Sequence, residues 1–277
     1  MIAGIGIAGT ATAERTLEPD AFPGRWNPHR AIPPDVEPAA TAAALALEDA
    51  GWWRSGSGKH CAGGLVVAID GASLPPTLHF ARALRAGPAS AIGPSSFLFS
   101  LPSSVSGVLG ILFGLTDYQA TMVGGSGVGI QALRHALDLM ELGRQTRLMV
   151  VVQSVGCDYE KDPELSRLAV AWCLDGSGGA SRYGASLQCG WGVDAPNFGF
   201  VAGHQVLSPL GREQTEAEIG DSGLAVLPLL RGSQWLSRSI PKRLQSNFLV
   251  RQDSSQSSTD AVGWIYMDTK GNSDAHK

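Results

Sequence analysis

The sequence predicts an α/β fold on three grounds. The runs Gly64–Ile69 and Arg147–Val152 are short and nearly all apolar, which is typical of strands buried on both faces of a sheet. The segments 37–50 and 127–142 have helical length and carry apolar residues along one face. Glycine- and proline-containing turns separate these runs. With 277 residues, 44% of them hydrophobic, the chain can bury a core without disulfides or metals.

At the N-terminal end, residues 2–8 alternate glycine with isoleucine or alanine, and we expect a buried strand there. A loop follows to about Pro34. The helix 37–50 comes next, and Gly51 stands where a left-handed C-cap is expected. Gly64–Ile69 is then the second strand, so the α/β alternation begins here.

Two helices are expected before the next strand. Pro75 and Pro76 open the first, which runs to about Arg85, because proline in the first turn removes no intrahelical hydrogen bond. Its inward face is expected to include Leu78 and Ala81, with Phe80 or Leu84. Residues 103–115 are almost wholly apolar and form the second helix, which is too short to span a membrane and is therefore expected to be buried.

A strand over residues 118–124 then turns through glycines into the helix 127–142, which ends near Gly143. After the strand at Arg147, a last strand pair is expected at 168–174 and 182–189.

Beyond about residue 200 the periodic signal decays. Residues 201–232 are a poorly defined extension of the preceding domain. Residues 233–277 include a Ser/Gln-rich stretch and are expected to form a flexible polar tail, because such a composition buries too little apolar surface to fold.

Composition excludes several classes of partner. A net charge of -4 with 17% charged residues gives no basic field for nucleic acid or for anionic lipid. The low charge, with 35 glycines, is typical of a chain that buries one face against another subunit. We expect a cytoplasmic protein, because the N-terminus is not cationic and no run reaches the roughly 18 apolar residues of a membrane span. The four cysteines have no zinc-type spacing and are expected to be buried, reduced thiols: Cys61, Cys157, Cys173 and Cys189.

The glycine-rich turn after residue 123 permits two kinds of chemistry. Gly127, Gly129 and Ala132 satisfy a GxGxxA spacing that lets a backbone approach a pyrophosphate. The next strand, however, ends at Gln153 and Ser154, where a ribose-binding carboxylate would be needed.

Ser126 in the same turn could be the nucleophile of a hydrolase. A nucleophile elbow needs GxSxG, and here Val128 stands at the final glycine position. A serine also needs a base, and the helix carries His135 nine residues beyond the turn, where it points away from it. The spacing of the candidate bases specifies none of them: His60, His79, His135, His204 and His276.

Several segments, in order, resemble the N-terminal half of a β-ketoacyl synthase, a condensing enzyme of the thiolase fold. They are Ile5–Gly9, Ala46–Trp52, Gly64–Ile69, and an ungapped run from Ser103 through Phe113 to the turn Ser126–Gly129. The resemblance covers about residues 1–200 as one domain and implies a layered α/β/α fold.

In the catalytic family, a cysteine at the position of Ser126 accepts the acyl group, and a helix N-terminus favours its thiolate. Two active-site histidines lie in a C-terminal half that has no counterpart here, and Gly203-His204 is its only vestige in this sequence. The resemblance therefore implies no catalytic residue and no metal. It implies instead a chain length factor, the noncatalytic partner of a ketosynthase in type II polyketide synthases, of the short kind found in aryl-polyene and related highly reducing polyene systems.

As a chain length factor, the protein would heterodimerise with a catalytic ketosynthase and limit the length of a polyketide. It would have no cofactor of its own, since the acyl chain is carried by the phosphopantetheine of an acyl carrier protein. The strand expected to pair antiparallel with the partner comprises Gln119, Ala120, Thr121, Met122 and Val123.

The resemblance also places an acyl-tunnel gate at Phe80, with Pro76 one turn earlier. A bulky ring there would exclude extra methylenes, each worth about 0.8 kcal/mol of burial. The plainer alternative is that Phe80 belongs to the core. The alternative function is a free-standing acyl hydrolase or acyltransferase that uses Ser126.

Overall fold

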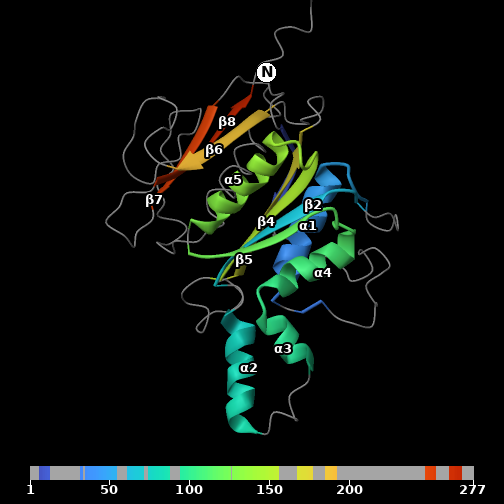
Figure 1. The fold of residues 1–277 in the computed structure, drawn as a ribbon, viewed down its shortest axis with the longest axis vertical. Helices are drawn as coiled ribbons and strands as arrows, with labels where there is room; N and C mark the ends of the chain where they lie inside the picture. The colour runs from blue at the N-terminus through green and yellow to red at the C-terminus, as the bar shows by residue number, and fades with distance from the viewer. Residues whose placement is uncertain are drawn as a thin grey trace, which may run out of the picture.

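The computed structural model describes most of the first 176 residues and three later strands. The described ranges are 6–12, 32–33, 35–54, 61–71, 74–87, 94–125, 127–155, 167–176, 185–191, 247–253 and 262–269. Figure 1 shows a twisted sheet with helices on it and a helical pair that extends away from it.

The centre of the fold is an eight-stranded mixed sheet in the order β3-β2-β4-β5-β1-β6-β8-β7. Strands β2, β3 and β4 are parallel, and every other neighbouring pair is antiparallel. The strand bounds are β1 Gly6–Thr12, β2 Gly64–Asp70, β3 Gln119–Val123, β4 Arg147–Val155, β5 Arg167–Asp175, β6 Ala185–Trp191, β7 Asn247–Asp253 and β8 Val262–Thr269.

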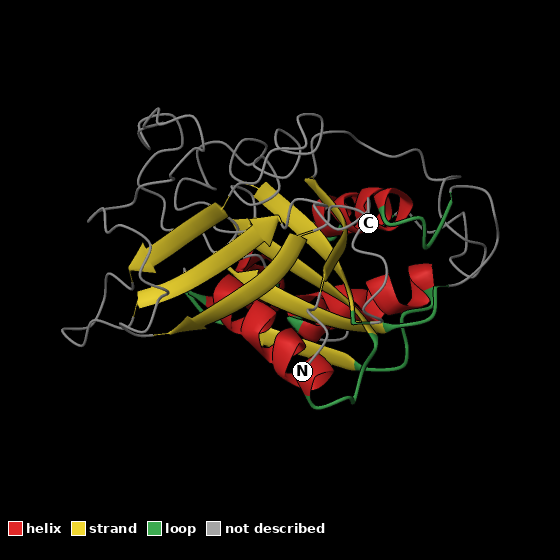
Figure 2. Cartoon of the chain, turned by 90° about the horizontal axis from the view of Figure 1, so that it is seen from above, coloured by secondary structure: helices red, strands yellow, loops and turns green. Residues whose placement is uncertain are grey.

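Helices cover both faces of this sheet (Figure 2). Helix α5 packs on one face, and α1 and α4 pack on the other. The layered α/β/α architecture expected from the sequence is therefore confirmed. The helix bounds are α1 Glu37–Asp49, α2 Leu74–Ala86, α3 Pro94–Ser100, α4 Ser103–Phe113 and α5 Val128–Glu141.

The residue pattern of β2 and β4 explains the two-sided core. Alternate residues of a strand point to opposite faces, and both faces are apolar here. Val66 and Val150 join the cluster under α5, whereas Leu65 and Met149 join the cluster under α1 and α4. Both strands are therefore buried on both faces, as their continuous apolar runs predict.

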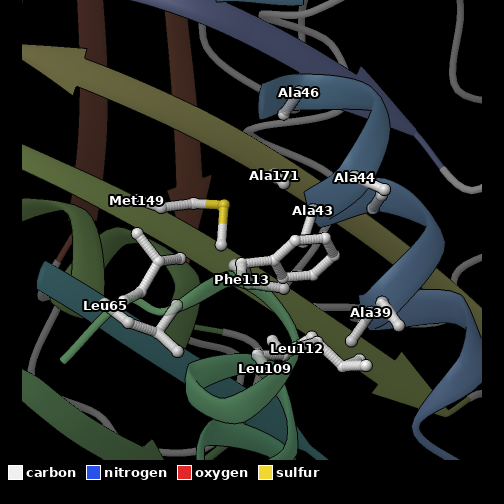
Figure 3. Packing of buried hydrophobic residues seen from close by; sticks show 14 of the residues in the cluster. Ala39, Ala43, Ala44, Ala46, Leu65, Leu109, Leu112, Phe113, Met149 and Ala171 are labelled. Carbon is white, nitrogen blue, oxygen red and sulfur yellow. The ribbon is translucent and has the colours of Figure 1, made fainter. Parts of the chain in front are cut away.

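The core under α1 combines small alanine side chains of α1 with the large ring of Phe113. Ala39, Ala43 and Ala44 on α1 are fully buried, so this helix can approach the sheet closely. Phe113 at the end of α4 fills the space left beside these alanines (Figure 3). Its ring also meets Trp53 edge-on, with centroids 5.6 Å apart. The packing of Phe113 against these alanines fixes the position of α4 on the sheet, and therefore also the position at which β3 starts.

Helices α2 and α3 form a projecting pair, which we call the arm. It extends away from the sheet at the lower end of Figure 1. The Thr77 hydroxyl donates to the Ser100 carbonyl oxygen at 3.1 Å, and α3 leads into α4. The sequence did not predict α3. Of the expected inward face of α2, Leu78, Phe80 and Ala81 are partly buried, whereas Leu84 is 44% exposed.

Two expectations about strand neighbours and the C-terminal segment are wrong. The strands at 168–174 and 182–189 form as β5 and β6, but β1 lies between them in the sheet. Residues 233–277 are not a flexible tail throughout, because β7 and β8 lie within them and β8 pairs with β6. The run Val262–Met267 is rich in β-branched and aromatic residues, which the neighbouring serines obscured.

Among the described residues, no helix combines the length and the apolar character needed to cross a bilayer.

Candidate functional site

The turn between β3 and α5 lies where the sequence places a possible nucleophile. Strand β3 ends at Val123, Gly124 follows, and the Val128 N–H donates to the Gly125 carbonyl oxygen at 2.9 Å as α5 begins. A Cβ on Gly124 would stand 3.2 Å from the Val128 Cβ, so the turn is tight. Ser126 itself lies outside the described residues.

The described histidines do not lie at this turn. His135 Nε2 and the Tyr118 hydroxyl are hydrogen bonded at 2.8 Å. Tyr118 stands just before the start of β3, whereas Ser126 follows the end of this strand. His79 is exposed on α2 in the arm. His60, His204 and His276 lie outside the described residues.

The end of β4 also offers no ribose-binding acid. Gln153 is fully buried, and its Nε2 donates to the Asp35 carbonyl oxygen at 2.5 Å just before α1. This amide holds two segments of the fold together. Dinucleotide binding at the GxGxxA turn therefore gains no support.

The described cysteines are unsuited to nucleophilic chemistry. Cys61 and Cys173 are free and buried, as expected, while Cys157 and Cys189 lie outside the described residues. Burial raises the pKa of Cys61 to about 11, and the nearby Arg147 lowers it only partly. Burial raises the pKa of Cys173 still more clearly, with Cys61 and Asp49 as smaller causes. Neither thiol replaces the cysteine that the turn lacks.

A labelling experiment can check these thiols. At pH 8, iodoacetamide should leave Cys61 and Cys173 unmodified in the folded protein and label both after denaturation, because thiolate forms only as the pH approaches the raised pKa. Peptide mass spectrometry distinguishes them from Cys157 and Cys189. Labelling of Cys61 in the folded state at the rate of a free thiol would contradict its burial.

Within the described part of the chain, strand β3 is the last strand at one end of the sheet, and its outer backbone edge has no strand beside it there. The Leu65 N–H donates to the Tyr118 carbonyl oxygen, and the Gly124 N–H donates to the Ile69 carbonyl oxygen. In a parallel ladder, alternate residues bond to the same neighbour. Even-numbered residues of β3 therefore bond to β2. The N–H and C=O groups that point outward belong to Gln119, Thr121 and Val123.

Side chains of the same odd-numbered residues fasten β3 to α4 and to the residues just after it. The Thr121 hydroxyl donates to Ser106 Oγ at 2.8 Å, and Gln119 Nε2 donates to the Leu115 carbonyl oxygen at 2.9 Å. A Cβ on Gly110 would overlap the Gln119 amide, so a larger residue there would displace that side chain from its bond to Leu115. The open edge is thus held in place by the subunit's own α4.

The predicted gate residues lie on the arm. The Phe80 ring is partly buried and packs on Phe97 of α3, with centroids 5.7 Å apart. Neither hydrophobic core includes Phe80, so its interpretation as a core residue is wrong. Pro76 lies one turn earlier on α2 and is partly buried. Among the described residues, no hydrogen bond or ring contact joins Phe80 or Pro76 to the turn at 124–128.

Comparisons with known proteins identify the fold. No protein-family model and no curated protein matches the sequence. Among solved structures, the chain resembles a chain of the ishigamide ketosynthase/chain length factor, with a TM-score of 0.65 and 15% identity over 97% of this chain and 100% of that one.

Two further structures agree. One is the ketosynthase ApeO in complex with its chain length factor ApeC from Xenorhabdus doucetiae, with a TM-score of 0.52 and 16% identity over 94% of this chain and 98% of that one. The other is AntDE:AntF, a type II polyketide synthase acyl-carrier protein in complex with its ketosynthase, with a TM-score of 0.63 and 10% identity over 98% and 100%. The chain therefore has the thiolase-like fold of ketosynthases and chain length factors.

Proposed function

We propose that the protein is a noncatalytic chain length factor, which heterodimerises with a catalytic ketosynthase and limits the length of a polyketide of the polyene type. One observation carries the proposal. The open edge strand β3 leads directly into the glycine turn of a condensing-enzyme fold, and the sequence has no cysteine in that turn.

The chemistry divides naturally between two subunits. A serine hydroxyl has little thiolate-like reactivity near neutral pH and needs a base, and neither described histidine lies beside the turn. The partner would supply the cysteine and the histidines. This chain would supply Phe80 and Pro76 to the acyl tunnel and residues 119–123 to the shared sheet, in the cytoplasm and without a cofactor of its own.

The structural neighbours support this assignment. The Xenorhabdus protein pair is a ketosynthase in complex with its chain length factor, and the AntDE:AntF assembly also holds an acyl-carrier protein. By analogy, the substrate here is an acyl chain carried on the phosphopantetheine of an acyl carrier protein.

Co-purification tests the proposal. Candidate ketosynthases from the same organism are coexpressed with the tagged chain, and one of them should co-elute in a stable complex. A monodisperse chain that associates with none of them would refute the assignment.

Replacing Ser126 with alanine separates this proposal from a serine enzyme. In the reconstituted pair, Ser126→Ala should keep product formation within about twofold of wild type, because the reacting thiol belongs to the partner. The measurement is product yield by liquid chromatography and mass spectrometry. A turnover by the isolated chain that Ser126→Ala abolishes would instead indicate an acyl hydrolase or acyltransferase.

A further inference from the structure

Sulfur-bearing side chains from two neighbouring strands lie together in the core beneath α1 and α4. Met149 of β4 and Cys173 of β5 are direct partners in the antiparallel ladder, and both belong to the hydrophobic cluster on this face of the sheet. Directly opposite residues on one face of such a pair have Cβ atoms about 4.5–5.5 Å apart. The thioether and the thiol are therefore close neighbours.

Cys61 joins these two residues from a different part of the chain. It precedes β2, and its N–H donates to the Phe113 carbonyl oxygen at 2.8 Å, at the end of α4. Its thiol lies near enough to Cys173 to raise the pKa of that second thiol. Figure 3 shows the Met149 side chain directed toward the Phe113 ring, within the same hydrophobic cluster. We call Cys61, Met149 and Cys173 the sulfur cluster.

The sulfur cluster is buried, and its thiols are free. Cys61 is 4% exposed, Met149 and Cys173 are fully buried, and neither cysteine forms a disulfide. The Cys61 thiol donates to the Trp52 carbonyl oxygen at 3.7 Å, and a thiol is only a weak donor. A single buried cysteine is usually a small hydrophobic residue. Two thiols and one thioether in one place are, in addition, a set of soft metal ligands.

The ligand set of the sulfur cluster decides which metal suits it. Structural zinc takes four ligands from cysteine, histidine and carboxylate side chains. Within the described ranges, no three such side chains are grouped so that they could hold a metal ion. Thiolate and thioether sulfurs instead select copper(I), whereas magnesium, calcium and manganese prefer oxygen ligands. A site made of two cysteines and one methionine therefore fits copper(I).

Arg147 provides positive charge beside the sulfur cluster. A copper(I) ion held by two thiolates leaves one net negative charge, which an apolar core alone would not stabilise. The Arg147 guanidinium lies near Cys61, since it lowers the pKa of that thiol against the effect of burial. It also stacks over the Trp52 ring at 5.2 Å and donates from Nε to Asp175 at 3.3 Å. Its side chain is 47% exposed, so the cluster lies close to solvent on this side.

We propose that the sulfur cluster binds one copper(I) ion, with Cys61 and Cys173 as thiolate ligands and Met149 as the thioether ligand. On binding, each thiol releases its proton to solvent and its sulfur bonds to the ion. The ion stays copper(I), and no electron is transferred. The site is independent of the proposed function and takes no part in acyl transfer.

An anaerobic titration of the full chain tests this site. Copper(I) is supplied as its complex with the chelator bathocuproine disulfonate, whose loss of colour reports transfer of the ion to the protein. The wild type should take up one ion, with only sulfur ligands in X-ray absorption spectra. Cys61→Ala and Cys173→Ala should each abolish this uptake. If either variant takes up copper(I) as tightly as the wild type, the proposal is wrong.

The two remaining cysteines provide matched controls. Cys157→Ala and Cys189→Ala remove thiols that are not part of the sulfur cluster, and both variants should bind copper(I) like the wild type. Loss of binding in these variants, with binding kept in Cys61→Ala and Cys173→Ala, would place the ion elsewhere and refute the site.

Met149→Leu tests the thioether without emptying the core. Leucine and methionine have similar volumes, so this variant should stay folded. Its affinity for copper(I) should fall roughly tenfold, because one soft ligand is lost. Met140→Leu is the control, since Met140 is buried in the other core, under α5, and should bind like the wild type. Equal affinities of Met149→Leu and Met140→Leu would refute the three-sulfur site.

Thermal unfolding distinguishes a site in the folded protein from thiols exposed on unfolding. A ligand that binds the folded state stabilises it, whereas binding to the unfolded chain destabilises the fold. One equivalent of copper(I) should therefore raise the melting temperature of the wild type and leave that of Cys173→Ala unraised. A fall in the wild-type melting temperature would overturn the proposal. No ketosynthase is present in these assays, so their result does not bear on the proposed function.

Discussion

Replacing Thr121 with proline should break the complex with the ketosynthase while the isolated chain stays folded. The Thr121 N–H points to the open edge of β3 and makes no bond to β2, so proline removes a donor that only the partner uses. Proline is tolerated on edge strands, and the extended residue before it suits its geometry.

The expected loss of affinity is large because proline has two separate effects. A missing hydrogen bond costs about 0.5–1.5 kcal/mol, and the ring also occupies the space between the two strands. Because about 1.4 kcal/mol corresponds to tenfold in affinity, the dissociation constant should rise at least tenfold. Analytical ultracentrifugation of the mixed subunits measures this change.

Thr121→Val is the control for the side chain. Both variants lose the hydroxyl bond to Ser106, but valine keeps the outward N–H. Thr121→Val should therefore bind nearly as well as wild type. If Thr121→Pro also binds as well as wild type, strand pairing through β3 is wrong.

Replacing Phe80 with alanine should lengthen the products of the reconstituted pair by at least one extension unit. Phe80 belongs to neither core and stands on the arm, beside Phe97, where the partner could cover it. Removing the ring opens room for further methylenes, each of which gains about 0.8 kcal/mol on burial. The product distribution by mass spectrometry is the measurement.

The same substitution should leave assembly intact. An aromatic pair contributes about 0.5–1.5 kcal/mol, so the isolated chain should lose little stability. His79→Ala, at the exposed neighbouring position on α2, is the control and should give wild-type products. Unchanged product lengths in Phe80→Ala, with the complex still formed, would remove Phe80 from the gate.

The candidate site could be predicted in part from the sequence. The strand predicted over 118–124 forms as β3 over Gln119–Val123, and the glycine turn after it follows from the residues alone. That residue 126 is a serine and not a cysteine is read from the sequence and needs no structure. Helix α3 and its pairing with α2 in the arm were missed.

The sequence by itself determined the local elements and the layered fold class. The buried runs of β2 and β4 and the alanine-rich face of α1 are local patterns, and local patterns specify periodicity and burial. Helix α5 likewise begins at Val128 and ends before Gly143, whose φ of +67° suits glycine.

Only the tertiary structure decided which strands are neighbours and which surfaces stay uncovered. It placed β1 between β5 and β6, added β7 and β8 to the sheet, and left β3 at the edge. It also showed that α2 packs on α3 instead of the core. The physical reason is that pairing and exposure depend on contacts between residues far apart in the chain, whereas sequence periodicity reports only which faces are apolar.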